Sequence, residues 1–262
     1  MQLSIDDDYL LRFVLKKTRA EFLRDARLPI SAADRRRFTV LKKRRAAGMP
    51  MQYIVGTAWF YGLEFFVSRA VLIPRPETEL LVDRAREKKF DLLIDVGTGS
   101  GAIAIALAKN VPATTKIIAC DISARALAVA KKNCTRHKTK VCFAHSNLLA
   151  EIPWPRAPHI LIAANLPYLS DARMKKISKT EVAHEPRRAL YGGHDGLDLY
   201  QKLFAQIREK KLSAQHITVL AEIDPEQKTK LAHLAARELP NSEILFHTDL
   251  RGDIRLAEII IS

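Results

Sequence analysis

The chain has 262 residues, of which 48% are hydrophobic and 27% charged, and its formal net charge is +14. This composition is that of a globular protein, and the length allows a second, smaller domain. No apolar stretch is long enough to span a membrane. The acidic cluster at residues 6–8 stands where a secretory signal would be basic, so we expect a cytoplasmic protein.

Residues 1–50 are predicted to form a small helical domain. Leu10, Leu11 and Val14 recur at helical spacing, and Ser31 is placed to cap a further helix. The segment holds 13 Lys and Arg against 6 Asp and Glu, so half of the positive excess lies in the first fifth of the chain. Such runs most often form solvated faces, but they can also attract an acidic partner or RNA.

Residues 51–73 are predicted to form a β-hairpin that links two domains. They combine aromatic and β-branched residues with Gly56 and Gly62. We expect short strands over residues 52–55 and 63–67.

Residues 74–262 show strands alternating with helices, which predicts an α/β fold with a mostly parallel, Rossmann-like sheet covered on both faces. The last two strands have no helix between them, so an antiparallel last strand is expected, as in the class I methyltransferase fold. The expected strands cover residues 92–96, 116–121, 141–144, 159–164, 217–223, 243–247 and 254–261, and the expected helices cover residues 102–109, 123–137, 196–210 and 225–238.

A glycine-rich loop follows the strand at residues 92–96. Glycines at a strand-to-helix turn let a ligand approach the main chain closely, and open parallel sheets bind their ligands at this edge. Asp121, at the end of the next strand, can accept both hydroxyls of a ribose. We therefore expect a cofactor that contains a nucleoside, held by Asp121 and by the loop residues Gly97, Thr98, Gly99, Ser100 and Gly101.

The loop favours S-adenosylmethionine over a dinucleotide. Its third glycine comes one residue earlier than in the dinucleotide pattern, and it has no basic residue for a pyrophosphate. Because the sulfonium of S-adenosylmethionine is positive, an acidic wall formed by Asp95 and Asp121 would suit it.

Asn165, Leu166, Pro167 and Tyr168 follow the apolar strand at residues 159–164. A planar nitrogen is a poor nucleophile because its lone pair is delocalised, so its hydrogens must be held and its plane fixed. The Asn165 side chain and the Leu166 carbonyl can each accept one N–H, Pro167 stiffens the turn, and the Tyr168 ring can pack on a planar group. The same four residues could instead form an ordinary turn. Paired with the glycine loop, they favour methyl transfer.

The chain resembles the release-factor glutamine methyltransferases over nearly its whole length. The resemblance rests on five stretches, at residues 50–56, 72–79, 95–101, 165–168 and 185–197. General methyltransferases lack the second and the fifth.

The resemblance implies transfer of a methyl group from S-adenosylmethionine to the glutamine side chain of the Gly-Gly-Gln motif in peptide-chain release factors, with S-adenosylhomocysteine as product. It implies that Asn147, Leu148 and Asn165 join the loop and Asp121 around the cofactor. Residues 165–168 would hold the glutamine, and the N-terminal domain would help to hold the release factor. Two residues depart from the usual family pattern. Leu166 replaces a proline, and Asn147 stands where family members often have an aspartate.

Two other functions stay open. An RNA adenine methyltransferase is favoured by the net charge and by Asn-Leu-Pro-Tyr, and disfavoured by residues 74–79 and 185–197. A catalytically silent binding protein is disfavoured by the intact loop, Asp121 and Asn165. We expect a monomer without direct nucleic-acid binding. We expect no metal, because the eight histidines form no ligand-spaced pair. The cysteines, Cys120, Cys134 and Cys142, are interpreted as buried thiols.

Overall fold

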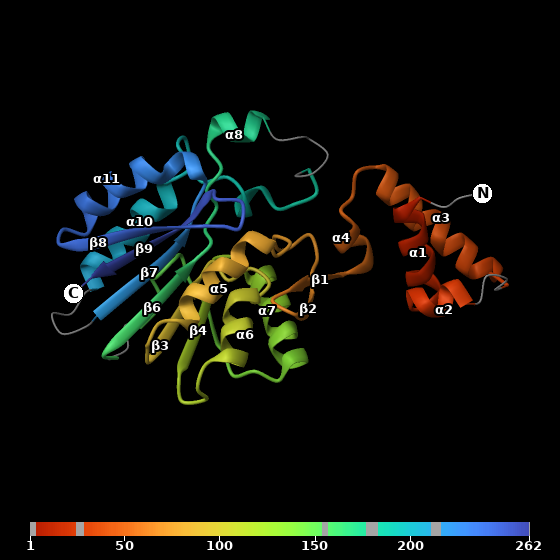
Figure 1. Ribbon diagram of the computed structural model, residues 1–262, viewed down its shortest axis with the longest axis horizontal. Coiled ribbons are helices and arrows are strands. Elements are labelled where there is room, and N and C mark those ends of the chain that lie inside the picture. Colours follow the sequence, from red (N-terminus) through yellow and green to blue (C-terminus); the bar gives the residue numbers. More distant parts are fainter. Residues whose placement is uncertain (1–3, 25–28, 154–156, 177–182, 211–215, 262) are drawn as a thin grey trace.

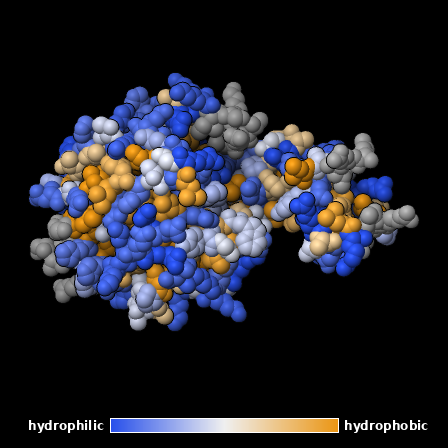
Figure 2. Space-filling model, viewed as in Figure 1, coloured by the Kyte–Doolittle hydropathy of each residue, from blue (hydrophilic) through white to orange (hydrophobic). Residues whose placement is uncertain are grey.

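The computed structural model describes residues 4–24, 29–153, 157–176, 183–210 and 216–261. They form an α/β body and a smaller helical bundle, which stands apart at the N-terminal end (Figure 1). In the space-filling view a narrow waist separates the two, and hydrophilic side chains cover most of the visible surface of the body (Figure 2). No helix among these residues is long and apolar enough to cross a membrane.

The bundle comprises α1 (Ile5–Leu15), α2 (Arg19–Arg24), α3 (Ala32–Ala46) and α4 (Met51–Val55). Leu10 and Val14 of α1 pack on Leu41 of α3 and Ile54 of α4. The Ser31 side chain caps α3 by accepting the Asp34 N–H at 3.0 Å, as predicted. Leu41 is the only buried residue of α3, so the remaining face of this basic helix is solvated.

A hairpin of β1 (Thr57–Phe60) and β2 (Leu63–Phe66) joins the bundle to the body. The strand expected at residues 52–55 is instead helix α4, which Gly56 ends in the left-handed conformation. As a helix, this short segment buries Ile54 in the hydrophobic cluster of the bundle. The Asn133 side chain accepts the Phe66 N–H at 2.7 Å and donates to the Phe66 carbonyl at 2.9 Å, and so fixes the hairpin to the body.

The body is built on a seven-stranded sheet in the order β5-β4-β3-β6-β7-β9-β8. Among the described strands, β9 pairs antiparallel with both β7 and β8 and all other pairs are parallel, which confirms the predicted class I methyltransferase sheet. The strands are β3 (Leu92–Val96), β4 (Lys116–Asp121), β5 (Cys142–His145), β6 (His159–Ala164), β7 (His216–Glu222), β8 (Ser242–Thr248) and β9 (Ile254–Ile261).

Helices cover both faces of the sheet, because the inner strands are apolar on both sides (Figure 1). Alternate residues of β3 and β6 belong to two different hydrophobic clusters, one shared with α10 and α11 and the other with α5 and α6. The helical segments of the body are η1 (Pro76–Thr78), α5 (Glu79–Arg86), α6 (Ala102–Asn110), α7 (Ala124–His137), α8 (Asp171–Lys176), η2 (Arg187–Ala189), α10 (Asp198–Lys210), η3 (Pro225–Gln227) and α11 (Lys228–Glu238).

Only one of the three cysteines is a fully buried thiol. Cys120 lies in the core, where burial raises the pKa of its thiol to about 12. Cys134 is half-buried and Cys142 is exposed, so the expectation of three buried thiols is wrong for these two. Cys142 begins β5 at the edge of the sheet, where one side of the strand faces solvent.

Candidate active site

Two cavities meet at the carboxyl edge of the sheet. One, of about 400 Å³, lies over the glycine loop, and the other, of about 840 Å³, lies between the body and the bundle. Both fall in the range of small-molecule sites, about 300–1,000 Å³. Four residues line both cavities: Leu72, Arg75, Asn165 and Ala189. Asn165 therefore stands at the junction of the two spaces.

The smaller cavity brings together nearly all of the residues predicted to bind a cofactor. Of this set, it is lined by Gly97, Thr98, Gly99, Ser100, Asp121, Asn147, Leu148 and Asn165. Gly101 is not among its lining residues. A Cβ at Gly101 would lie 3.0 Å from Ile105 Cδ1 and 3.2 Å from the Ala130 Cβ, so its role here is close packing of α6 against α7.

Asp121 is placed at the floor of this cavity by two backbone donors. Its Oδ2 accepts the Gly99 N–H at 2.9 Å, and its Oδ1 accepts the Ser123 N–H at 2.8 Å. Burial raises the pKa of Asp121, while these two hydrogen bonds oppose the rise. Next to it, the apolar side chain of Ile122 is 56% exposed and lines the same cavity. A carboxylate beside an uncovered apolar surface suits a ribose attached to a planar base.

Asp95 does not form part of the acidic wall expected from the sequence. It is fully buried and lies outside the cavity lining. Its Oδ2 accepts the Thr98 hydroxyl at 2.6 Å and the Ala104 N–H at 3.1 Å, so it fastens the glycine loop to α6. Burial raises the pKa of Asp95 to about 6. Asp95 therefore fixes the loop from beneath, and the carboxylates that line this cavity within the described residues are those of Asp121 and Asp198.

The turn at residues 165–168 is held by two side chains and one close backbone approach, all from later segments of the chain. The Tyr200 hydroxyl lies 3.0 Å from the Ala164 carbonyl and 2.5 Å from the Glu222 carbonyl, at the ends of β6 and β7. The Gln227 side chain donates to the Tyr168 carbonyl at 2.8 Å. A Cβ at Gly196 would overlap the same carbonyl oxygen, so only glycine allows this close approach.

Leu166 has a buried side chain, 2% exposed, in the position where the family pattern has proline. Its Cδ2 lies against Gly97, where a Cβ would come within 3.0 Å of it. Within the described parts of the chain, no N–H or O–H group of the protein donates to the Leu166 carbonyl. The leucine side chain therefore packs under the cofactor loop, and its carbonyl is available to accept a hydrogen bond from a substrate.

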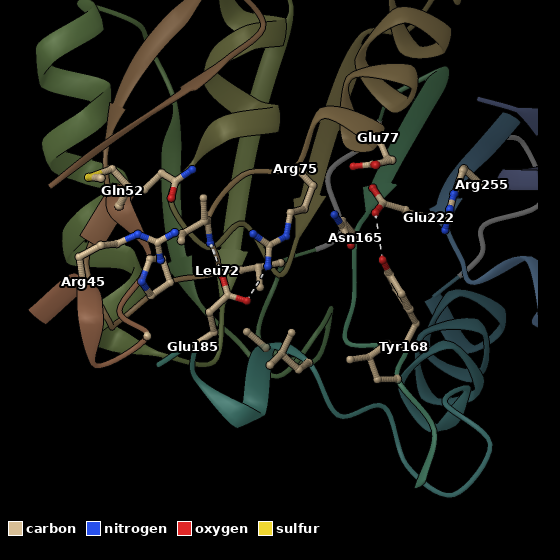
Figure 3. A pocket seen from close by; sticks show the side chains of 17 residues that line it. Arg45, Gln52, Leu72, Arg75, Glu77, Asn165, Tyr168, Glu185, Glu222 and Arg255 are labelled. Atoms are coloured by element: carbon tan, nitrogen blue, oxygen red, sulfur yellow. Dashed lines mark hydrogen bonds and ion pairs between the residues drawn. The ribbon is translucent and has the colours of Figure 1, made fainter. Parts of the chain in front are cut away.

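The larger cavity is strongly charged. Figure 3 shows Arg45 and Gln52 on one side and Asn165, Glu222 and Arg255 on the other, with Arg75 and Glu185 between them. The Arg75 guanidinium lies 2.5 Å from a Glu185 oxygen, and the other oxygen accepts the Ile73 N–H at 3.4 Å. Burial raises the pKa of Glu185, and Arg75 opposes the rise.

The sequence analysis missed two residues of this site, Thr78 and Glu222. The Asn165 Nδ2 donates to the Thr78 hydroxyl at 2.9 Å. Glu222 is 3% exposed, lines the larger cavity and lies 3.5 Å from the Tyr168 hydroxyl. The sequence did contain a signal for Glu222, which is the last residue of an apolar strand, as Asp121 is. Within the described ranges, no group of three or more His, Cys, Asp and Glu side chains could hold a metal ion.

This fold, with its glycine loop and its Asn-Leu-Pro-Tyr turn at neighbouring strand ends, is that of a class I methyltransferase. Family models match in two places, the methyltransferase small domain at residues 76–194 and the PrmC N-terminal domain at residues 4–56. The release factor glutamine methyltransferase of Dictyoglomus turgidum is 33% identical, over 98% of this chain and 90% of its own. The chain belongs to the release factor glutamine methyltransferase family.

Other relatives agree with this assignment, and solved structures share the fold. The enzyme of the same name from Koribacter versatilis is 39% identical over 77% of this chain and 73% of its own, and that of Bacillus anthracis is 33% identical over 95% and 89%. A Pyrococcus furiosus methyltransferase has a TM-score of 0.53 at 14% identity and covers 88% of this chain and 98% of its own. The catalytic domain of hMettl16, solved with an RNA hairpin, has a TM-score of 0.57 at 15% identity and covers 89% and 83%. At these identities the two structures show the fold alone.

Proposed function

We propose that the protein transfers a methyl group from S-adenosylmethionine to the side-chain amide nitrogen of the glutamine in the Gly-Gly-Gln motif of release factors, in the cytoplasm. The observation that carries this proposal is the position of Asn165, which lines both the loop cavity and the larger, charged cavity. A donor bound in the first cavity and an acceptor bound in the second would meet at this side chain. The family assignment supports the choice of acceptor.

The residues of the smaller cavity fit S-adenosylmethionine. Asp121 presents a carboxylate for the ribose hydroxyls, and Ile122 and Leu148 offer apolar surface for the adenine. The backbone of residues 97–100 lines the space between them and Asn165. When bound, the cofactor supplies an electrophilic methyl group on a positive sulfur.

The protein's own residues would prepare the acceptor nitrogen. We assign the Asn165 Oδ1 and the Leu166 carbonyl to accept one N–H each, which fixes the amide plane and directs the lone pair toward the donor cavity. The Tyr168 ring would pack against the amide. Gln227 and Gly196 hold the backbone carbonyl of Tyr168 in place. The nitrogen becomes acidic as it gains the methyl, so no strong base is needed before attack.

The bundle would help to bind the release factor. Arg45, Met51 and Gln52 line the larger cavity from the bundle side, opposite Asn165. Runs of exposed basic residues on α3, at positions 35–37 and 42–44, would attract an acidic surface of the factor. In this proposal the enzyme is a monomer with three parts. Residues 1–50 dock the substrate, residues 51–73 link the two domains, and residues 74–262 form the catalytic domain.

The test is incorporation of labelled methyl groups from S-adenosylmethionine, with a release factor and ribosomal RNA offered separately. We expect label in the release factor and none after its Gly-Gly-Gln glutamine is replaced by alanine. Label that appears in RNA and survives protease would replace this function with the adenine methyltransferase. Cofactor binding without transfer to either substrate would favour a silent binding protein.

Asp121→Ala is expected to weaken binding of S-adenosylmethionine by about 1–3 kcal/mol, the usual cost of losing a hydrogen bond to a charged group. The reason is the placement of this carboxylate by Gly99 and Ser123 at the cavity floor. Isothermal titration calorimetry measures the effect. Glu243→Ala, which removes an exposed acid from the edge strand β8, should bind as tightly as the wild type. Equal affinity in both variants would contradict the assignment.

A further inference from the structure

Three polar side chains from distant parts of the chain converge behind the acceptor turn. Asn165 follows Ala164 at the end of β6, and Glu222 follows Ala221 at the end of β7, where Ala164 and Ala221 are paired in register. Thr78 comes from η1, and it is 4% exposed. The close-up shows Asn165 and the Glu222 carboxylate side by side at the wall of the larger cavity (Figure 3).

One of these groups, the Thr78 hydroxyl, holds the Asn165 amide. The Asn165 Nδ2 donates to this buried hydroxyl at 2.9 Å. A hydroxyl oxygen has two lone pairs, so it can accept this hydrogen bond while its own hydrogen serves another acceptor. Interaction with Thr78 also opposes the rise that burial causes in the pKa of Glu222.

This hydrogen bond sets which end of the Asn165 amide faces Thr78, and it is the Nδ2 end. The Oδ1 end is then directed away from Thr78, on the side where Asn165 borders the cavities. A reversed amide would instead present two N–H groups to the two N–H groups of a substrate amide, which would repel it.

We propose that Thr78 is a positioning residue that holds the Asn165 amide in its acceptor orientation. The inference rests on the proposed function for its effect on catalysis, but the orientation itself is independent of the substrate. Thr78 acts directly on Asn165 and does not need to touch the substrate for this role.

Thr78→Val replaces the hydroxyl with a methyl group of similar shape and tests the proposal. We expect kcat on the release factor to fall about tenfold or more, because the acceptor oxygen is no longer held in place. The KM for the factor and the affinity for S-adenosylmethionine should stay within about twofold. Thr78→Ser keeps the hydroxyl and should restore most of kcat. Thr218→Val makes the same exchange on β7 at a position that lines neither cavity, and should leave kcat unchanged.

A second readout needs no substrate. The side-chain amide signal of Asn165 in a ¹⁵N correlation spectrum, assigned by its loss in Asn165→Ala, should show slowed hydrogen exchange in the wild type and Thr78→Ser. That protection should disappear in Thr78→Val and persist in Thr218→Val. Unchanged protection in Thr78→Val overturns the proposal, whatever the activity. If protection is lost in Thr78→Val but the wild-type enzyme methylates no release factor, the positioning role stands and the proposed substrate is refuted. Loss of protection with unchanged kcat would refute the positioning role.

Discussion

Asn165→Ala should lower the rate of methyl transfer about a hundredfold or more while the protein stays folded and still binds S-adenosylmethionine. The expected loss is that of one preorganised hydrogen-bonding group at the reacting centre. Asn165 is one of several residues around the smaller cavity, so its removal leaves Asp121 and the loop in place. The effect should therefore appear in kcat, with only a small change in cofactor affinity.

Single-turnover kinetics with a release factor, together with calorimetry for the cofactor, measure these two quantities. Asn110→Ala is a matched control, because the Asn110 amide bonds only a backbone carbonyl at the end of α6. Wild-type turnover in Asn165→Ala would place the acceptor site elsewhere in the molecule.

Glu222→Gln should stabilise the protein above neutral pH and at the same time reduce its activity. Burial raises the pKa of Glu222 to about 7, and the charge of Glu77 adds to the rise, while Thr78, Arg255 and Tyr168 oppose it. The pKa in the unfolded chain is the ordinary value of 4.5. Between these pH values the folded protein binds a proton that the unfolded chain has lost, so stability falls as the pH rises through this window.

The difference corresponds to about 3 kcal/mol at pH 8, since one pKa unit is about 1.4 kcal/mol. Glutamine has no charge to bury, so the variant should escape this loss, and its advantage should vanish below about pH 4. Urea denaturation of both proteins at several pH values gives the comparison. Activity should fall severalfold, because Glu222 lines the larger cavity beside the Tyr168 hydroxyl and the exchange removes its charge there. Parallel stability curves for the two proteins would contradict the raised pKa.

The sequence predicted the body of the molecule well because its strands and helices have strong patterns. The expected strands at residues 92–96 and 159–164 match β3 and β6 to the residue, and Ser123 caps α7 as expected. The strand predicted at residues 52–55 was wrong because so short a segment, in which three of the four residues are apolar, fits a helix as well as a strand.

The sequence predicted those site residues whose chemical role follows directly from the residue type. Asn165, Asp121 and the loop could be read from their places at strand ends. The support for Asn165 could not, because Thr78 lies 87 residues away along the chain and meets it only in the folded protein. Asp95 was assigned to the wrong surface because alternation along β3 sends its side chain beneath the loop, toward α6.

Two carbonyl acceptors at the turn would also limit how many methyl groups the nitrogen between them can receive. An unmethylated amide has two, one for the Asn165 Oδ1 and one for the Leu166 carbonyl. After one transfer a single hydrogen remains, and the new methyl group would have to point at an oxygen that it cannot bond. The Tyr200 hydroxyl and the buried Leu166 side chain keep this turn from widening. The proposed reaction therefore stops at the monomethyl amide, and mass spectrometry of the product should show an increase of one methyl group and never two.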